Sequence, residues 1–294
     1  MPNRLICVAI LLFWTIAAGT LFTRDILPTF LLGSPPDLRT ISQADDAAGP
    51  TRWSILAIDE GKPNNPRSVG QIVTETHRKR DGWVKMTSTA WLDSGELVRG
   101  TLFESKQSER IWVLGLCEID ATGNLQDFRV GIRLDESPKR EVLSIEGRLR
   151  KEVMEVTTRS IVPGLNGTQS IPYQPRGIVQ NSLGPLERMP GLQVGQTWET
   201  QVVSLMTGKL QTCRVMVVGT EHIIWGSTPV LTLKVVTKMA PITAATWVRP
   251  DGLVLRQEIP FANKIKLILE RVPDDPDKMA RPTTPPTTTQ GKQR

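Results

Sequence analysis

The amino-acid sequence predicts an all-β protein, a large curved antiparallel sheet or open half-barrel, with an N-terminal transmembrane helix. Short segments rich in Val, Ile, Thr and Trp alternate with turn residues through most of the chain, as in antiparallel β proteins. No window of about twelve residues in this part shows the apolar stripe of an amphipathic helix. A long uncharged apolar run stands near the N-terminus.

The apolar run covers the eighteen residues from Leu5 to Phe22 and lies between Arg4 and Arg24. As a helix it would be about 27 Å long, close to the roughly 30 Å of a bilayer's hydrocarbon core. Arg4 on the short side should stay cytoplasmic. The alternative is a cleaved signal peptide, because Ala17–Gly19 supplies small residues after a shorter apolar core. Either way the domain is exported, and we predict a single-pass inner-membrane protein with its domain on the periplasmic side.

Composition divides the chain into four parts. Residues 1–24 are the anchor or signal peptide, and residues 25–50, rich in Pro, Asp and Ala, are expected to form a stalk or linker. Residues 51–272 are expected to form the β domain. Residues 273–294, rich in Thr and Pro, carry too few apolar side chains to offset the entropy of ordering and are predicted to be disordered.

The β domain contains a succession of predicted strands separated by Gly, Asp, Asn and Pro. These segments are 52–58, 69–78, 83–92, 110–119, 128–134, 141–149, 152–158, 197–205, 210–219, 230–238, 244–248, 253–259 and 264–272.

A proline- and glycine-rich segment, residues 161–189, separates two possible halves of this domain, 51–160 and 190–272. Loops of this length are usually functional lids or linkers between subdomains. The segment holds Tyr173, the only tyrosine. As a lid it would contact a ligand, and as a connector it would join two curved sheets.

The stretch WVRPDGLVLRQEI, residues 247–259, gathers four charged residues and raises the question of an active site. Pro250, Asp251 and Gly252 are instead typical of a tight hairpin turn. With side chains alternating after the turn, Leu253 and Leu255 would point to one face and Val254, Arg256 and Glu258 to the other. The charges are then predicted to scatter over a turn and a solvated face.

Eight tryptophans accompany the single tyrosine. Such rings either fill the interior of a wide curved sheet or line an apolar cavity. The candidate ligand-binding residues are therefore Trp83, Trp91, Trp112, Tyr173, Trp198 and Trp247.

Catalytic groups are scarce. The two histidines, His77 and His222, lie at a strand end and a turn, and no phosphate loop, zinc spacing or calcium loop occurs. We therefore predict no catalytic residue, no metal, no cofactor and no enzymatic activity. Cys117 and Cys213 fall in separate predicted strands, where they could pair in an oxidising compartment or remain two buried thiols.

The chain carries a formal net charge of +6, with basic clusters at 77–80 and 148–151. Neither cluster is interleaved with the aromatic residues that stack on bases, so no nucleic-acid partner is expected.

Four stretches resemble, in order, the consensus of a family of mostly uncharacterised bacterial envelope domains often found beside transglutaminase-like proteins. They are VGQIVTETHRKRDGWVKMTSTAWLD (69–93), MPGLQVGQTW (189–198), VVGTEHIIWGSTPVLTLKVV (217–236) and WVRPDGLVLRQEIP (247–260). The resemblance implies a half-barrel similar to those of bacterial lipoprotein carriers, whose concave face can hold acyl chains. It carries over no catalytic residue, because the transglutaminase triad belongs to a separate domain.

Together these observations predict a non-catalytic, membrane-anchored envelope protein that binds an apolar or lipid-like ligand in a concave β domain. The alternative is an accessory module for an envelope partner, such as a transglutaminase-like protein or a transporter. A ligand-binding domain should have a cavity lined by several of the candidate tryptophans. A partner module should have a filled core and an exposed patch or sheet edge.

Overall fold

All the strands in the described part of the chain belong to one antiparallel sheet of 14 strands. The structure is a computed structural model, and it describes residues 49–59, 65–79, 81–98, 109–121, 124–134, 141–173, 185–203, 210–239, 242–262 and 265–273. The first meander comprises β1 (Thr51–Asp59), β2 (Arg67–Arg78), β3 (Val84–Asp93), β4 (Arg110–Ile119), β5 (Leu125–Arg133), β6 (Glu141–Arg150), β7 (Val153–Ser160) and β8 (Gly167–Pro172), with a short helix α4 (Ser94–Val98) after β3. The second comprises β9 (Thr197–Val203), β10 (Leu210–Trp225), β11 (Thr228–Met239), β12 (Ile242–Val248), β13 (Val254–Ala262) and β14 (Ile265–Arg271).

Pairing between the first and the last strand joins the two meanders. The strand order is β8-β7-β6-β5-β4-β3-β2-β1-β14-β13-β12-β11-β10-β9, so the edges are β8 and β9, which are consecutive in the sequence. Within each meander every strand pairs with its sequence neighbour, as short hairpin connections favour. The predicted all-β class, antiparallel pairing and open sheet are therefore confirmed.

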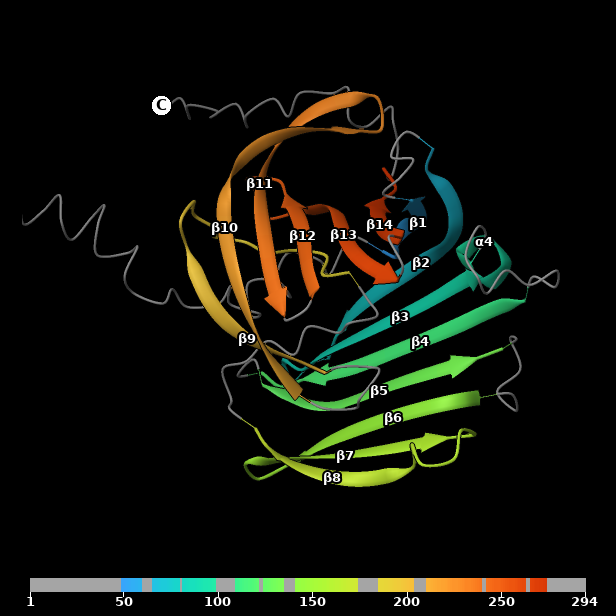
Figure 1. Ribbon diagram of the computed structural model, residues 1–294. Coiled ribbons are helices and arrows are strands. Elements are labelled where there is room, and N and C mark those ends of the chain that lie inside the picture. Colours follow the sequence, from blue (N-terminus) through green and yellow to red (C-terminus); the bar gives the residue numbers. More distant parts are fainter. Residues whose placement is uncertain are drawn as a thin grey trace, which may run out of the picture.

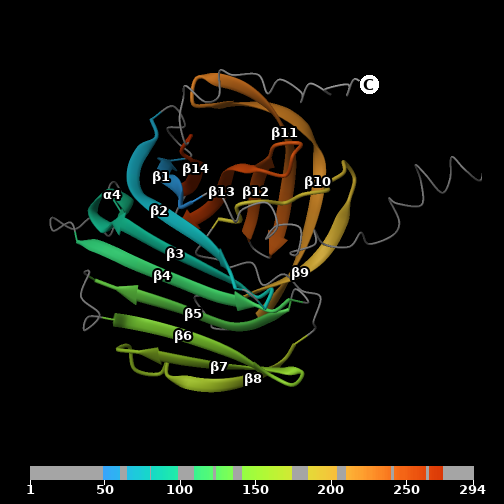
Figure 2. The same cartoon turned by 180° about the vertical axis from the view of Figure 1, so that it is seen from behind.

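The sheet curves strongly, and the long β10–β11 hairpin arches over β12 to β14 in both views (Figures 1 and 2). We call the side that carries Trp53, Ile55 and Ala57 the core face and the opposite side the outer face. These three side chains are at most 3% exposed, whereas the residues between them on β1 are partly exposed. The period-two burial follows from the pleat of a strand with one face packed.

The main core on this face draws side chains from both meanders. Trp53 of β1, Val113 of β4, Trp198 of β9 and Val235 of β11 all belong to one buried cluster. A second cluster continues across β3 to β7 and includes Phe128 and Tyr173. Because the possible halves 51–160 and 190–272 share one sheet and one core cluster, neither packs as a separate unit in the structure.

Residues 185–192, which we call the strap, cross the core face. Leu186 and Met189 of the strap are buried in the main core. The Met189 N–H donates to the Gly252 carbonyl at 2.7 Å, and the Val254 N–H donates to the Glu187 carbonyl at 3.0 Å. The strap is thus held to the start of β13, and its apolar side chains occupy space inside the curve of the sheet.

A buried polar group fixes the other side of the strap. Glu187 accepts a hydrogen bond from the Thr74 hydroxyl of β2. Nearby, Arg271 of β14 donates to the Thr51 hydroxyl at 3.2 Å and places its guanidinium over the Trp53 ring. Each of these polar residues is at most 6% exposed. Buried charges need such partners, so the strap joins β2 to β13 through a satisfied polar contact.

Two elements differ from the prediction. The segment 161–189, treated as one loop, contains strand β8, because its backbone pairs with β7 although its side chains are nearly all exposed. Helix α4 was not predicted, and it places Leu97 in the core. No helix among the described residues is long and apolar enough to span a bilayer. The predicted anchor at 1–24, nearly all of the stalk at 25–50 and nearly all of the tail at 273–294 lie outside the described residues.

Candidate functional site: a tryptophan row on the outer face

One cross-strand row on the outer face brings together three of the six candidate aromatic residues. Pairing partners follow one another across ten strands, from β11 to β6. We call this set the outer row; in order it is Lys234, Trp247, Arg256, Glu270, Ser54, Gln71, Trp91, Trp112, Arg133 and Glu141. Residues that face each other across neighbouring strands lie about 5 Å apart, so their side chains interact.

The β2–β5 part of the row, together with Arg110 two residues before Trp112 on β4, forms a patch that we call the tryptophan patch: Gln71, Trp91, Arg110, Trp112 and Arg133. Trp91 of β3 and Trp112 of β4 are direct partners, and both are partly exposed. The Arg110 guanidinium lies 5.2 Å from the centre of the Trp91 ring. Arg133 is the partner of Trp112 on β5, and its Nε is buried without a hydrogen-bond partner among the described residues.

The other end of the row is a compact charged cluster around Trp247. The Lys234 ammonium and the Arg256 guanidinium lie 5.1 and 5.4 Å from the Trp247 ring centre. Because these cations come from the strands on either side of β12, they flank the ring. Glu221 of β10 accepts hydrogen bonds from Trp247 Nε1 and, at 3.2 Å, from Lys234.

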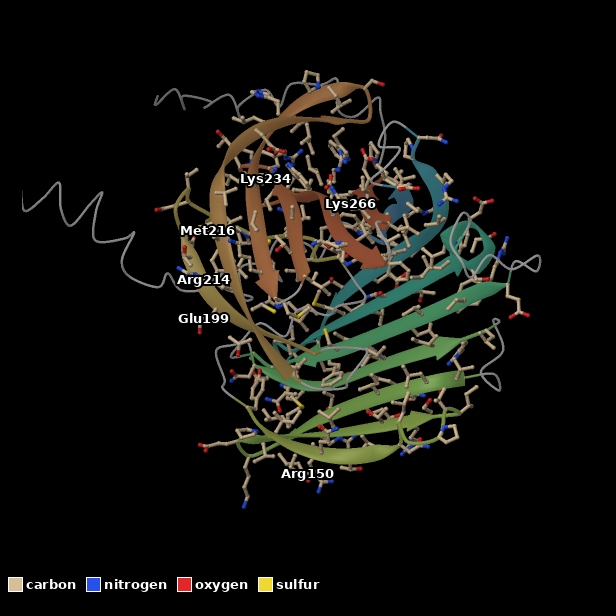
Figure 3. The ribbon with its side chains drawn as sticks, viewed as in Figure 1. Arg150, Glu199, Arg214, Met216, Lys234 and Lys266 are labelled. Atoms are coloured by element: carbon tan, nitrogen blue, oxygen red, sulfur yellow. The ribbon has the colours of Figure 1, made fainter. Side chains whose placement is uncertain are left out.

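Glu258 extends this cluster along β13. It accepts from Arg256 at 2.8 Å and pairs with Lys266 of β14 at 3.0 Å. Figure 3 shows Lys234 and Lys266 within the arch of the β10–β11 hairpin. The end of that hairpin packs on the same side, since Ile223 and Trp225 share an apolar cluster with Trp247. The cluster is therefore internally paired and partly covered, unlike the tryptophan patch.

Two carboxyl groups in and beside this cluster, Glu221 and Glu270, have pKa values that are shifted in opposite directions. Burial alone would raise the pKa of Glu221, but hydrogen bonds from Trp247 and Lys234 lower it overall. Burial raises the pKa of Glu270, and the charge of Arg256 only partly opposes this. Relative to the unfolded chain, folding thus favours the ionised form of Glu221 and the protonated form of Glu270.

We expect Glu221→Gln and Glu270→Gln to change stability with opposite signs at neutral pH. The stabilisation from Glu221 is present above the unfolded-state pKa of about 4.3 and is lost as pH falls through the lower folded value. The stabilisation from Glu270 is present below that pKa and is lost as pH rises through its higher folded value. At pH about 7, Glu221→Gln should therefore lower the melting temperature and Glu270→Gln should raise it. The change in the free energy of unfolding should be less than about 1 kcal/mol for each variant, because both sites are partly solvated.

Melting curves of both variants between about pH 3 and 7 test this, because both differences from the parent protein should shrink on acidification. Shifts of the same sign at neutral pH would contradict the assignment.

The stretch 247–259 contains the predicted turn, but its charges do not all scatter. The Gly252 N–H donates to the Arg249 carbonyl at 2.8 Å, and Gly252 has a φ of 88°, as this tight turn requires. Beside the turn the register of β12 and β13 shifts. Trp247 is opposite Arg256 and Val248 is opposite Val254, which leaves Leu255 as an extra residue in β13. This bulge returns Arg256 to the Trp247 side and places Val254 in the core. The prediction that Val254 shares a face with Arg256 was wrong for this reason, whereas Leu253 and Leu255 do lie together in one apolar cluster.

The remaining candidate aromatic residues lie in three separate places. Trp198 is 2% exposed in the main core. Tyr173 is buried in the second cluster, where its hydroxyl accepts from the Leu125 N–H at 3.1 Å. Trp83 lies at the β2–β3 turn with Lys79 over its ring at 5.8 Å. The six candidates therefore do not converge on one binding site.

The two described cysteines are not joined by a disulfide. Cys117 lies on β4 and Cys213 on β10, and β3, β2, β1, β14, β13, β12 and β11 stand between them in the sheet. Burial raises the pKa of the Cys117 thiol to about 12 and also raises that of Cys213. In the structure Cys213 is buried and Cys117 is partly buried, and neither is in a disulfide.

Each of the basic clusters at 77–80 and 148–151 contains cations that pair with acids. Lys79 pairs with Glu118 at 3.1 Å, Arg148 with Asp127 at 2.9 Å and Arg150 with Glu155 at 3.1 Å. Arg150, the last residue of β6, lies near the bottom of the sheet in Figure 3. Within the described ranges, no group of three or more His, Cys, Asp and Glu side chains is arranged to hold a metal ion.

Comparison with solved structures finds proteins of similar fold. The fold is similar to a crystal structure of a beta-barrel-like protein of the domain of unknown function DUF1849 from Brucella abortus, with a TM-score of 0.46 and 10% sequence identity. The match covers 76% of this chain and 95% of that chain. No protein-family model matches the sequence, and no curated protein matches it. An association with transglutaminase-like proteins is not among these findings.

Proposed function

We propose that the protein is a non-catalytic interaction module of the bacterial envelope, which binds a partner protein through the tryptophan patch. The patch unites two adjacent indole rings with two arginines and a glutamine on one side of β2 to β5. Trp and Arg are the residue types most enriched among the energetic hot spots of protein interfaces. This pairing of Trp91 with Trp112 is the observation that carries the proposal.

The surroundings of the patch fit a protein surface better than a small ligand. Val73, Leu114 and Leu116 lie on the same outer face, two and four residues further along their strands in the register. Apolar and aromatic side chains on a broad sheet face, with arginines at the side, provide the apolar centre and polar rim of an interface.

The core face supports the interaction module over the lipid carrier. The main core holds Trp53 and Trp198 together with Leu186 and Met189 of the strap. A lipid-like ligand bound there would have to displace side chains that now pack on one another, at the cost of their buried contacts.

Anchoring is supported by the sequence. The uncharged run from Leu5 to Phe22 is long enough to cross a bilayer, and Arg4 favours a cytoplasmic N-terminus. We propose a single-pass protein of the inner membrane with the β domain on the periplasmic side, where its partner would be another envelope protein.

The proposal is tested by photo-crosslinking of the full chain in intact bacteria. A benzophenone amino acid replaces Thr89, which is next to the patch on the outer face of β3, or His222, which is exposed on the distant β10. We expect a discrete crosslinked protein from position 89 and none from 222. The band should disappear in the double variant Trp91→Ala and Trp112→Ala and persist in the control Trp83→Ala.

Equal crosslinking from both positions, or a band that survives the double variant, would count against the patch. Native mass spectrometry distinguishes the alternative, because a bound lipid adds a discrete mass that organic extraction removes. Such a mass would favour a ligand on the core face.

A further inference from the structure

Strand β8 gives the sheet an open edge. Among the described strands it pairs with β7 alone, from Thr158 opposite Gly167 to Val153 opposite Pro172. Its residues are exposed except for Ile171, which is partly buried. In an edge strand, alternate backbone N–H and C=O groups point away from the sheet and can pair with another extended chain.

Among the described residues, Pro172 at the end of β8 is the one device of the kind that usually blocks such pairing at this edge. Natural edge strands are protected by lysine or other charged side chains, by proline, by bulges or by a covering helix. From Gly167 to Ile171, β8 carries Thr168, Gln169 and Ser170 and neither a charged residue nor a proline. Its register with β7 runs without a shift, so the edge is regular.

An apolar tip stands at the start of this strand. Ile161, Val162 and Leu165 in the β7–β8 turn are 69%, 51% and 48% exposed. The turn is ordered by its own hydrogen bonds, because Asn166 Oδ1 accepts from the Ser160 N–H at 2.6 Å and the Ser160 hydroxyl accepts from the Val162 N–H at 2.9 Å. Three large apolar side chains are therefore presented to solvent by a folded turn beside the edge.

We propose that β8 is a docking edge for an extended peptide segment of another protein, which adds to the sheet as an antiparallel strand. Antiparallel pairing continues the pattern of the whole sheet. Since β8 runs away from the tip, an antiparallel peptide ends beside it. The peptide that fits is uncharged and β-forming along Thr168 to Ser170, with apolar residues at its C-terminal end against Ile161, Val162 and Leu165.

The size of the edge favours a short peptide over a second globular domain. Strand β8 is 6 residues long. Stable interfaces between globular proteins bury about 1,200–2,000 Å², more than one strand of this length provides. Strand addition of a short segment, by contrast, obtains its affinity from main-chain hydrogen bonds and its specificity from a few side-chain contacts.

The test uses the full chain in detergent and two synthetic peptides as probes. In the first, alternating threonine and glutamine residues are followed by isoleucine and valine at the C-terminus, and the second has the reversed sequence. We expect the first to bind about tenfold more tightly by fluorescence anisotropy, because only its apolar end meets the tip. In the bound chain the amide resonances of residues 167–171 should shift.

Two proline variants separate loss of docking from loss of folding. Thr168→Pro and Gln169→Pro remove successive backbone N–H groups, of which one points outward and the other toward β7. The variant that keeps the parent melting temperature should lose peptide binding. Equal binding of the two peptides, binding of neither, or unchanged binding in that variant would overturn the proposal.

This inference is independent of the tryptophan patch. The double variant Trp91→Ala and Trp112→Ala should bind the peptide as the parent does. Loss of crosslinking at position 89 with retained peptide binding would therefore distinguish the two surfaces.

Discussion

Replacing Trp53 with alanine should lower the free energy of unfolding by about 3–5 kcal/mol, the usual cost of removing a large aromatic side chain from a core. Trp53 is 0% exposed and packs in the cluster that unites both meanders and the strap. For a domain of this size, 1 kcal/mol corresponds to about 2–4 °C, so the melting temperature should fall by about 6–20 °C. Thermal unfolding followed by circular dichroism measures the shift.

Trp53→Phe is the matched control. The Trp53 Nε1 is buried and has no hydrogen-bond partner among the described residues. Phenylalanine removes this unpaired donor, which offsets part of the lost packing, so its cost should be clearly smaller than that of alanine. Equal costs for the two variants would show that the indole does not fill the core as described.

Gly70→Ala should destabilise the sheet through a backbone collision. A Cβ at this position would stand 2.1 Å from the Trp91 carbonyl oxygen on the neighbouring strand. A carbonyl in a paired strand cannot turn aside as a side chain can, so β2 and β3 must separate locally. Overpacking of this kind costs about 1–3 kcal/mol, or about 2–12 °C of melting temperature in a domain of this size.

The control for Gly70 is Gly167→Ala in β8. A Cβ there would meet no atom within 4 Å. This variant should keep the melting temperature of the parent, while Gly70→Ala lowers it and also disturbs the strand that carries Trp91. Similar melting temperatures for the two variants would contradict the close approach of β2 and β3.

The sequence predicted the sheet because its signals are local. Alternating apolar residues and turns such as Arg249 to Gly252 depend on neighbouring residues, and that turn formed as expected. Strand β8 was missed because its side chains are polar and exposed, and its pairing depends on β7. Helix α4 was missed because 5 residues cannot display a helical period.

The candidate site depended on register, which local patterns do not specify. Trp91, Trp112 and Trp247 were selected because tryptophan is abundant, but only the pairing across the sheet shows that they share one row. One extra residue in β13, Leu255, reverses the expected face of Val254. A signal for the Trp91–Trp112 pair was nevertheless present. Trp91 lies near the end of β3 and Trp112 near the start of β4, so antiparallel pairing of these two strands brings them together.

The pairing of β1 with β14 has a consequence for how the chain acquires its structure. Trp53 is opposite Arg271, so the strand pair at the middle of the sheet joins residues from nearly opposite ends of the domain's sequence. Contacts between residues so distant in sequence raise the contact order, and high contact order slows folding. During synthesis β1 must wait, with one side unpaired, until the last strand has left the ribosome. The nascent domain should therefore need protection from aggregation until its final residues emerge.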